Sequence, residues 1–126
     1  MKTIQANGIK LAYESFGDEA SPTILLIAGL GTQMIRWTGP FCEALAARGY
    51  RVIRFDNRDT GCSTHFSQYP PLDFSVLAAT LMAGQRPDVP YTLDDMAADA
   101  ISLLDSLSID RAHLIGHMSL VGPWAA

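Results

Sequence analysis

The segment TILLIAG at residues 23–29 and the two segments that follow it predict the central part of the fold. TILLIAG is a continuous apolar run of strand length that ends at a glycine, as expected for a strand covered on both faces. PFCEALAARG (residues 40–49) has the spacing of a short amphipathic helix, and Gly49 is available as a positive-φ residue at its end. YRVIRF (residues 50–55) is typical of a second strand. The order strand, helix, strand predicts a right-handed parallel crossover.

Further strands are expected on both sides of this crossover. KTIQ and IKLAYESFG flank Asn7-Gly8, a dipeptide that favours the positive φ angles of a tight turn, so the chain should begin with an antiparallel hairpin. RAHLIG at residues 111–116 predicts one more short strand. The expected fold class is therefore α/β, with a partial doubly wound mixed sheet in which an antiparallel N-terminal hairpin is followed by parallel strands.

Two helices are predicted in the second half of the chain. Thr92 and Asp95 resemble a capping box, which indicates a helix that begins there and ends near Leu107. Its apolar residues are expected to form one stripe over the parallel sheet: Met96, Ala97, Ala100, Ile101, Leu104 and Leu107. In this register, Ile101→Asp would bury a charge without a partner. Residues 64–91 are too long for a plain connection, and FSVLAATLMAG within them predicts a short lid-like helix.

Composition limits the possible functions. A length of 126 residues with 48% apolar residues indicates one globular domain. Nine basic and 13 acidic residues without a basic cluster argue against nucleic acid or an anionic membrane as a partner. The sequence has no long uninterrupted apolar run and no apolar signal segment, so we expect a soluble, cytoplasmic protein. Cys42 and Cys62 lack a metal-binding spacing and are expected to be reduced thiols.

Three segments, in this order, resemble the α/β-hydrolase superfamily over the whole chain. LLIAGLGTQMIRW (residues 25–37) looks like the strand and loop that carry the oxyanion hole in that family. RVIRFDNRDTGCSTHF (51–66) looks like the Asp-x-Arg-x-x-Gly-x-Ser turn after the next strand. YTLDDMAADAISLLDSLSIDRAHLIGH (91–117) is similar to the helix and strand that lead to the nucleophile. Small esterases of the anthracycline methylesterase and proline iminopeptidase type are the most similar members.

The resemblance implies hydrolysis of a carboxylic ester or related acyl bond through a serine nucleophile, with no cofactor and no metal. The residue after Ala28-Gly29 would donate its backbone N–H to the oxyanion, which assigns this role to Leu30. The second donor would be the residue after the nucleophile, which aligns with Ser119. Residues 1–126 would then form the N-terminal part of a hydrolase domain.

The turn DNRDTG is interpreted more simply than a catalytic site. Asp56 and Arg58 are expected to belong to a structural turn in which the aspartate caps backbone N–H groups and Gly61 takes a positive φ. His65 follows this turn without an adjacent acid that would mark it as a base, so it is expected at the surface.

The end of the chain departs from the family at the nucleophile. The family has Gly-x-Ser-x-Gly at a sharp turn between strand and helix, whereas LIGHMS (residues 114–119) places Met118 in the serine position and Ser119 one residue later. A thioether has no proton to lose and cannot form an acyl-enzyme. Ser119 is the remaining candidate nucleophile, although His117 then stands where a glycine belongs. His113 and His117 precede the candidate, whereas the family's acid and histidine follow it.

These departures leave three interpretations open. The chain alone should be inactive as an enzyme if it is one part of a hydrolase. It is alternatively a binding or assembly module, because the strand near Ala112–Ile115 would leave an unpaired apolar edge for self-association or strand addition. In the third interpretation, a second chain supplies a complementary fragment and completes a working hydrolase.

Overall fold

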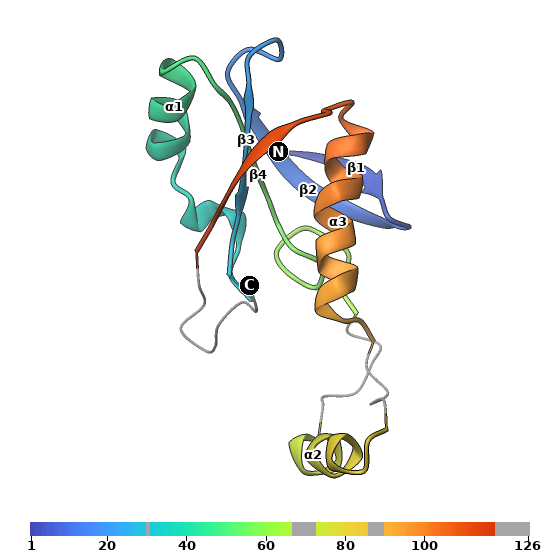
Figure 1. Ribbon diagram of the computed structural model, residues 1–126. Coiled ribbons are helices and arrows are strands. Elements are labelled where there is room, and N and C mark those ends of the chain that lie inside the picture. The colour runs from blue at the N-terminus through green and yellow to red at the C-terminus, as the bar shows by residue number, and fades with distance from the viewer. Residues whose placement is uncertain (30, 67–72, 86–89, 118–126) are drawn as a thin grey trace.

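The computed structural model describes residues 1–29, 31–66, 73–85 and 90–117, and five strands in these ranges form one mixed sheet (Figure 1). The strands are β1 (Lys2–Ala6), β2 (Ile9–Phe16), β3 (Thr23–Ile27), β4 (Arg51–Phe55) and β5 (Ala112–Gly116). Their order in the sheet is β1-β2-β4-β3-β5. The pairs β1/β2 and β2/β4 are antiparallel, whereas β4/β3 and β3/β5 are parallel. The predicted fold class is therefore confirmed.

The N-terminal hairpin forms as its turn residues require. Asn7 and Gly8 have φ angles of 53° and 77°, and Ala6 pairs with Ile9 across the turn. Both φ angles are positive, as in the two-residue turns whose twist matches that of the flanking strands. Asn-Gly supplies them at low steric cost, and the register of β1 on β2 follows from this turn.

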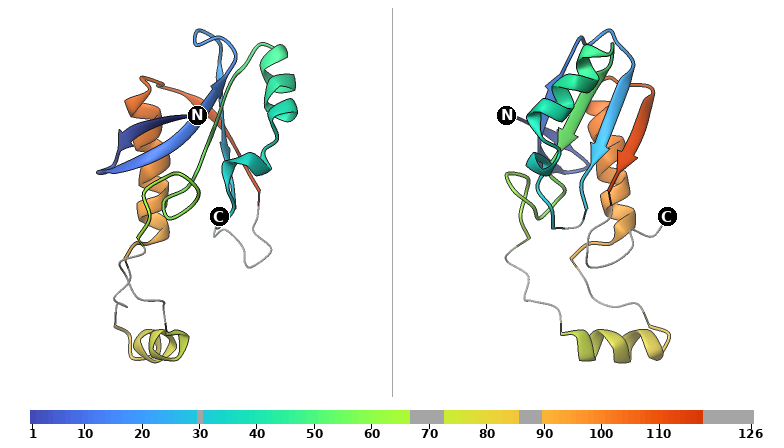
Figure 2. Two further views of the ribbon diagram at one scale, coloured as in Figure 1. Left: turned by 180° about the vertical axis from the view of Figure 1, so that it is seen from behind. Right: turned by 90° about the vertical axis from the view of Figure 1, so that its left-hand side faces the viewer.

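The two faces of the sheet are covered by different helices, α1 (Gly39–Ala47) and α3 (Leu93–Ser106), as Figure 2 shows. Side chains alternate along a strand, so β3 contributes to both faces. Ile24 and Leu26 pack with Cys42 of α1, whereas Leu25 packs with Leu103 of α3. A continuous apolar strand is what this two-sided burial demands.

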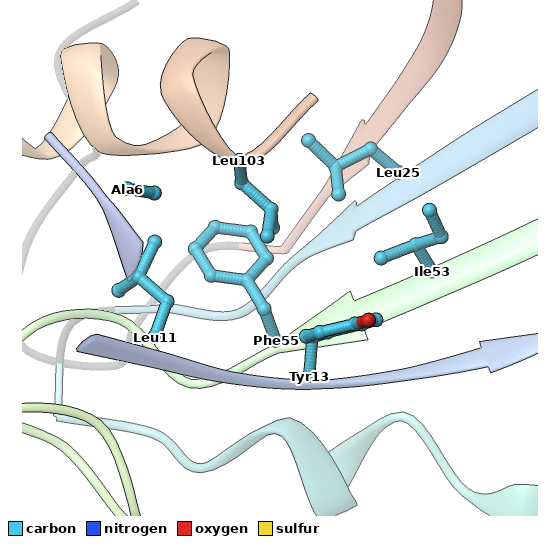
Figure 3. Close-up of a cluster of buried hydrophobic side chains, with 7 residues drawn as sticks. All are labelled: Ala6, Leu11, Tyr13, Leu25, Ile53, Phe55 and Leu103. Atoms are coloured by element: carbon cyan, nitrogen blue, oxygen red, sulfur yellow. The ribbon is translucent and has the colours of Figure 1, made fainter. Parts of the chain in front are cut away.

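The larger core cluster lies between α3 and the sheet (Figure 3). Its buried members come from β1, β2, β3, β4 and α3, and they are Ala6, Leu11, Tyr13, Leu25, Ile53, Phe55 and Leu103. Figure 3 shows the Leu103 side chain directed from the helix toward the ring of Phe55. Antiparallel and parallel parts of the sheet thus share one core.

Helix α3 has the predicted start but a different buried face. The capping box is present, with the Thr92 side chain accepting from the Asp95 backbone N–H and the Asp95 side chain accepting from that of Thr92. The residues buried in α3 are Met96, Asp99 and Leu103, and Ala100, Leu104 and Leu107 pack partly against the core. The prediction that Ile101 and Ala97 face the sheet is wrong, because Ile101 is 62% exposed and Ala97 is exposed as well. The buried face includes Asp99, a charged residue that an apolar pattern leaves out.

The predicted helix within residues 64–91 is confirmed as α2 (Phe74–Met82). Asp73 caps its start by accepting hydrogen bonds from the backbone N–H groups of Ser75 and Val76. Figures 1 and 2 show α2 standing apart from the sheet, and its large apolar side chains Phe74, Val76, Leu81 and Met82 are exposed. Among the described residues, no helix combines the length and apolar character needed to cross a membrane.

Both cysteines are free thiols, as expected. Cys42 is buried under α1, and this burial raises the pKa of its thiol above the usual value. Cys62 is exposed in the turn after β4.

The register of α3 leads to a matched pair of predictions. Leu103→Asp should lower the free energy of unfolding by several kcal/mol, because it places an unpaired carboxylate in the core cluster. Ile101→Asp should change it by less than about 0.5 kcal/mol, because that side chain is exposed. Urea unfolding followed by circular dichroism measures both. Equal losses in the two variants would contradict this register.

Candidate functional site

The candidate site lies where the three parallel strands end. The arrows of β3, β4 and β5 point the same way in the right-hand view of Figure 2, so their carboxyl ends meet at one edge of the sheet. Ligand-binding residues of open α/β sheets lie outside this edge. The segments there are the loop after β3, which leads into the 3-10 helix η1 (Met34–Arg36), the turn after β4, and His117 after β5.

The carboxylate of Asp56 lies at the centre of the turn after β4. Its Oδ1 accepts a hydrogen bond from the Met34 backbone N–H at 2.8 Å, and its Oδ2 accepts one from the Cys62 N–H at 3.0 Å. Gly61 has a φ of 54°, and a Cβ at this position would overlap the carboxylate. The interpretation of Asp56 and Gly61 as parts of a structural turn is confirmed, and the turn also reaches the loop after β3.

The next residue, Asn57, makes a second contact with that loop. Its Nδ2 donates to the backbone carbonyl of Ala28 at 3.0 Å, and the Asn57 side chain is buried. Sequence reasoning did not select Asn57. The available signal was its place directly after a capping aspartate at the end of a buried strand.

Arg58 joins the turn to helix α3 through a buried ion pair. Its Nε and Nη2 donate to the two carboxylate oxygens of Asp99 at 2.6 and 2.8 Å. The exposed fractions of the two side chains are 7% and 2%, and Asn7 Nδ2 donates to the same carboxylate at 2.9 Å. The hydrogen bonds to Asp99 raise the pKa of Arg58 above its ordinary value. Asp99 was missed because it lies inside an otherwise apolar helix face.

Asp59 and Arg58 together hold the ends of the segment that carries α2. The rings of Phe66 and Tyr91 lie 5.3 Å apart, and the Arg58 guanidinium lies 5.2 and 5.4 Å from their centroids. Asp59 accepts from the Phe66 backbone N–H and from the Tyr91 hydroxyl, both at 3.0 Å. Phe66 and Tyr91, which flank this segment, therefore lie side by side.

The three histidines lie at different places. His65 is exposed, as expected, with its Nε2 2.7 Å from the Gly61 carbonyl and its Nδ1 3.8 Å from Asp59. His117 lies at the carboxyl edge, where its ring is 4.9 Å from that of Trp37 and its backbone N–H donates to the Ile27 carbonyl at 3.3 Å. His113 lies farther back on β5, beside the ring of Tyr50.

The predicted catalytic residues themselves are not placed by the structure. Leu30, Met118 and Ser119 lie outside the described residues. The structure does describe the residues on either side of Leu30. Gly29 is buried and its carbonyl accepts from the Thr32 N–H at 2.9 Å, and Gly31 has a φ of 73°. The loop therefore turns sharply directly after β3.

A metal site and a surface pocket are the two other kinds of site to consider. In the described part of the chain, no three His, Cys, Asp or Glu side chains converge as they would to hold a metal ion. A surface pocket of about 700 Å³ is lined by Pro22, Thr23, Asp110, Arg111, Ala112 and His113. It lies at the amino ends of β3 and β5, at the edge opposite the Asp56 turn, so it is not part of the candidate site.

A family model described as alpha/beta hydrolase fold matches residues 22–117. Rhodomycin D methylesterase DauP of Streptomyces sp. (strain C5) is 36% identical over 119 residues, which cover 94% of this chain and 34% of that protein. 3-oxoadipate enol-lactonase 2 of Acinetobacter baylyi is 29% identical over 126 residues, with 98% and 39% covered. The crystal structure of the enol-lactonase from Burkholderia xenovorans LB400 superposes with a TM-score of 0.66 at 29% identity, covering 91% of this chain and 36% of that one. The chain thus spans about a third of the length of these relatives.

The environment of Tyr91 generates a prediction on pH. Burial and the hydrogen bond to Asp59 raise the pKa of Tyr91 to about 12. Because the folded-state pKa is raised, the Tyr91 phenol contributes to the free energy of unfolding, and this contribution is complete below the ordinary tyrosine pKa of about 10. It is lost as the pH rises from there toward the folded-state value. In a spectrophotometric titration, the difference between the parent and Tyr91→Phe should show one phenol that ionises near pH 12. A difference curve centred near the ordinary value would contradict the Asp59 contact.

Proposed function

Because the chain belongs to the alpha/beta hydrolase fold family, we propose that it supplies the oxyanion side of a hydrolase for carboxylic esters or related acyl bonds. Residues 1–126 would be the N-terminal part of the hydrolase domain. The substrates would be small-molecule esters, the class that the name rhodomycin D methylesterase indicates for that relative. No cofactor or metal takes part in this proposal, and we assign the protein to the cytoplasm.

One observation carries this proposal: the loop after β3 is held between two neighbouring strands at the carboxyl edge. Asp56 and Asn57 contact it from the β4 side. On the β5 side, the ring of His117 lies against the ring of Trp37, which is the residue that follows η1. A loop in this place can direct backbone N–H groups toward a substrate carbonyl above the edge of the sheet. We propose the N–H of Leu30 as one such donor.

The proposed chemistry is acyl transfer to a serine. A serine oxygen attacks the ester carbonyl while a histidine takes its proton, and the loop donors stabilise the tetrahedral oxyanion. The histidine gives this proton to the alcohol as the ester C–O bond breaks, and water then hydrolyses the acyl-enzyme to the acid and the free serine. Ser119 is the candidate nucleophile within these residues. In the alignment, Met118 takes the nucleophile position, and Ser119 would then be the second oxyanion donor. No histidine follows His117 in the sequence, so the base and its acid would come from residues outside these 126. Helix α2 would form part of a lid over the substrate.

A repair experiment tests this proposal. The double change Met118→Ser and Leu120→Gly rebuilds Gly-x-Ser-x-Gly at residues 116–120. Alone, this variant should hydrolyse p-nitrophenyl acetate at background rate, because the serine has no base. Addition of a fragment of rhodomycin D methylesterase DauP that follows its equivalent of β5 and lacks its own nucleophile segment should give turnover that a serine-directed phosphonate abolishes. The Ser119→Ala change in the unrepaired chain should have no effect. Saturable hydrolysis by either chain alone would overturn the proposal.

The edge of β5 favours a second candidate function, that of an assembly module. Within the described residues, β5 pairs with β3 and has no second strand partner. Leu114 and Ile115 on this strand are 62% and 38% exposed. Unpaired backbone groups beside exposed apolar side chains are a template for strand addition. We propose that β5 pairs with another copy of the chain or with a complementary fragment.

Sedimentation velocity tests this association. The parent should form a dimer or larger species at high micromolar concentration, and Leu114→Lys should shift it toward monomer, because a charge on an edge strand opposes pairing. Leu81→Lys on α2 is the matched control: it charges an equally accessible leucine, which is 56% exposed, and should leave the association unchanged. A parent that sediments as a monomer would rule out the assembly module. Loss of association in Leu81→Lys alone would instead assign the contact to α2.

A further inference from the structure

We propose that Asp56 and Asn57 are positioning residues that orient the backbone of the loop after β3 for catalysis. This inference rests on the proposed function, since it assigns these side chains a role through the oxyanion loop. Neither residue would touch the substrate. Each acts on a backbone group of the loop, one at the start of the loop and one at its end.

The two contacts enclose the loop. Asn57 Nδ2 holds the carbonyl of Ala28, the first residue after β3, at 3.0 Å. Asp56 Oδ1 holds the N–H of Met34, where η1 begins, at 2.8 Å. Asp56 and Asn57 are each 3% exposed, so neither hydrogen bond is open to exchange with bulk water. Five residues, 29–33, lie between the two fixed points.

Asp56 is itself held on every side. Its backbone N–H donates to the Ala12 carbonyl at 3.0 Å, and its carbonyl accepts from the Ser63 hydroxyl at 2.6 Å. The Ser63 oxygen in turn accepts from the Ala12 N–H at 2.9 Å. Strand β2 and the turn therefore fix the backbone of Asp56, and the absence of a Cβ at Gly61 leaves room for its carboxylate. Through Asp56, the position of the loop is thus fixed relative to β2, in the antiparallel half of the sheet.

This arrangement matters for chemistry because donors stabilise an oxyanion only in a narrow geometry. Removal of one donor typically lowers kcat by about 10² to 10³, and small displacements of a donor also lower the rate. A loop whose ends are fixed loses little orientation freedom when the charge develops. The effect is expected in kcat more than in KM, because the substrate's ground state does not need the precise donor direction.

The first experiment measures the loop directly in the 126-residue chain. Asn57→Asp preserves shape but replaces the donor with a carboxylate oxygen that repels the Ala28 carbonyl. Asp56→Ala removes the acceptor of the Met34 N–H. In amide hydrogen exchange, each should accelerate exchange around residues 31–36 by about tenfold or more, and leave α3 unchanged. The Met34 amide proton of the parent should resonate downfield, as for a bond to a carboxylate, and lose this shift in Asp56→Ala.

Ser106→Ala is the matched control. It removes the hydrogen bond from the Ser106 hydroxyl to the Gln5 carbonyl at 3.0 Å, and this contact touches neither the loop nor the turn after β4. Its exchange around residues 31–36 should equal that of the parent. If Asn57→Asp and Asp56→Ala leave exchange in the loop unchanged, or accelerate it equally throughout the chain, the inference is wrong. If Asp56→Ala fails to fold, Asn57→Asp decides by the same criterion.

The second experiment uses the repaired chain with its complementing fragment. Asn57→Asp should lower kcat for p-nitrophenyl acetate by about tenfold or more and change KM by less than about threefold, whereas Ser106→Ala should change neither. The positioning role would be overturned if Asn57→Asp accelerated exchange in the loop but left kcat unchanged, or if it changed KM alone. Absence of turnover in the repaired and complemented chain that carries no change at Asn57 would overturn the proposed function instead, and with it the catalytic role of the loop. The exchange results distinguish these failures.

Discussion

The guanidinium of Arg58 and the carboxylate of Asp99 meet in the interior through two hydrogen bonds of 2.6 and 2.8 Å, and the remaining contacts of the edge are arranged around this pair. Two charges are costly to remove from water, and the cost is offset only where geometry is good and further donors are satisfied. Asn7 provides one further donor from the N-terminal hairpin. The pair therefore ties together the hairpin, the turn after β4 and α3, which lie far apart in the sequence.

Around the pair, consecutive residues of one short turn serve different neighbours. Asp56 and Asn57 hold the loop after β3, Arg58 holds α3, and Asp59 holds both ends of the segment that carries α2. A displacement of the turn would reach all of these elements together. The candidate oxyanion loop and the candidate lid are thus attached to the same turn after β4. This arrangement would let a lid close over the site while the donors keep their geometry.

The sequence predicted what local chemistry determines. The apolar run of β3, the Asn-Gly hairpin and the Thr92 capping box are local signals, and the structure confirms each. The buried face of α3 was predicted correctly at four of its six positions and wrongly at Ala97 and Ile101. The prediction left out Asp99, whose partner Arg58 lies 41 residues away. No local pattern reveals such a pair.

The site was predictable to a lesser extent. Asp56 and Gly61 were placed correctly as a turn, since an aspartate and a glycine at this spacing have few other uses. Asn57 was missed because its partner, a backbone carbonyl, carries no sequence signature. The roles of Leu30 and Ser119 rest on the resemblance alone, and both residues lie outside the described part of the chain.

The strand order has a consequence for how the chain acquires its structure. β1 and β2 are adjacent in sequence and can pair early, whereas β3 waits for β5, with Thr23 beside Ala112 and Ile27 beside Gly116. Such distant pairing is slow, because the entropy of closing a long loop is lost before any contact compensates it. During synthesis, we expect β3 to remain unpaired on one side until β5 has left the ribosome. The nascent chain would therefore present an apolar strand edge to chaperones until then.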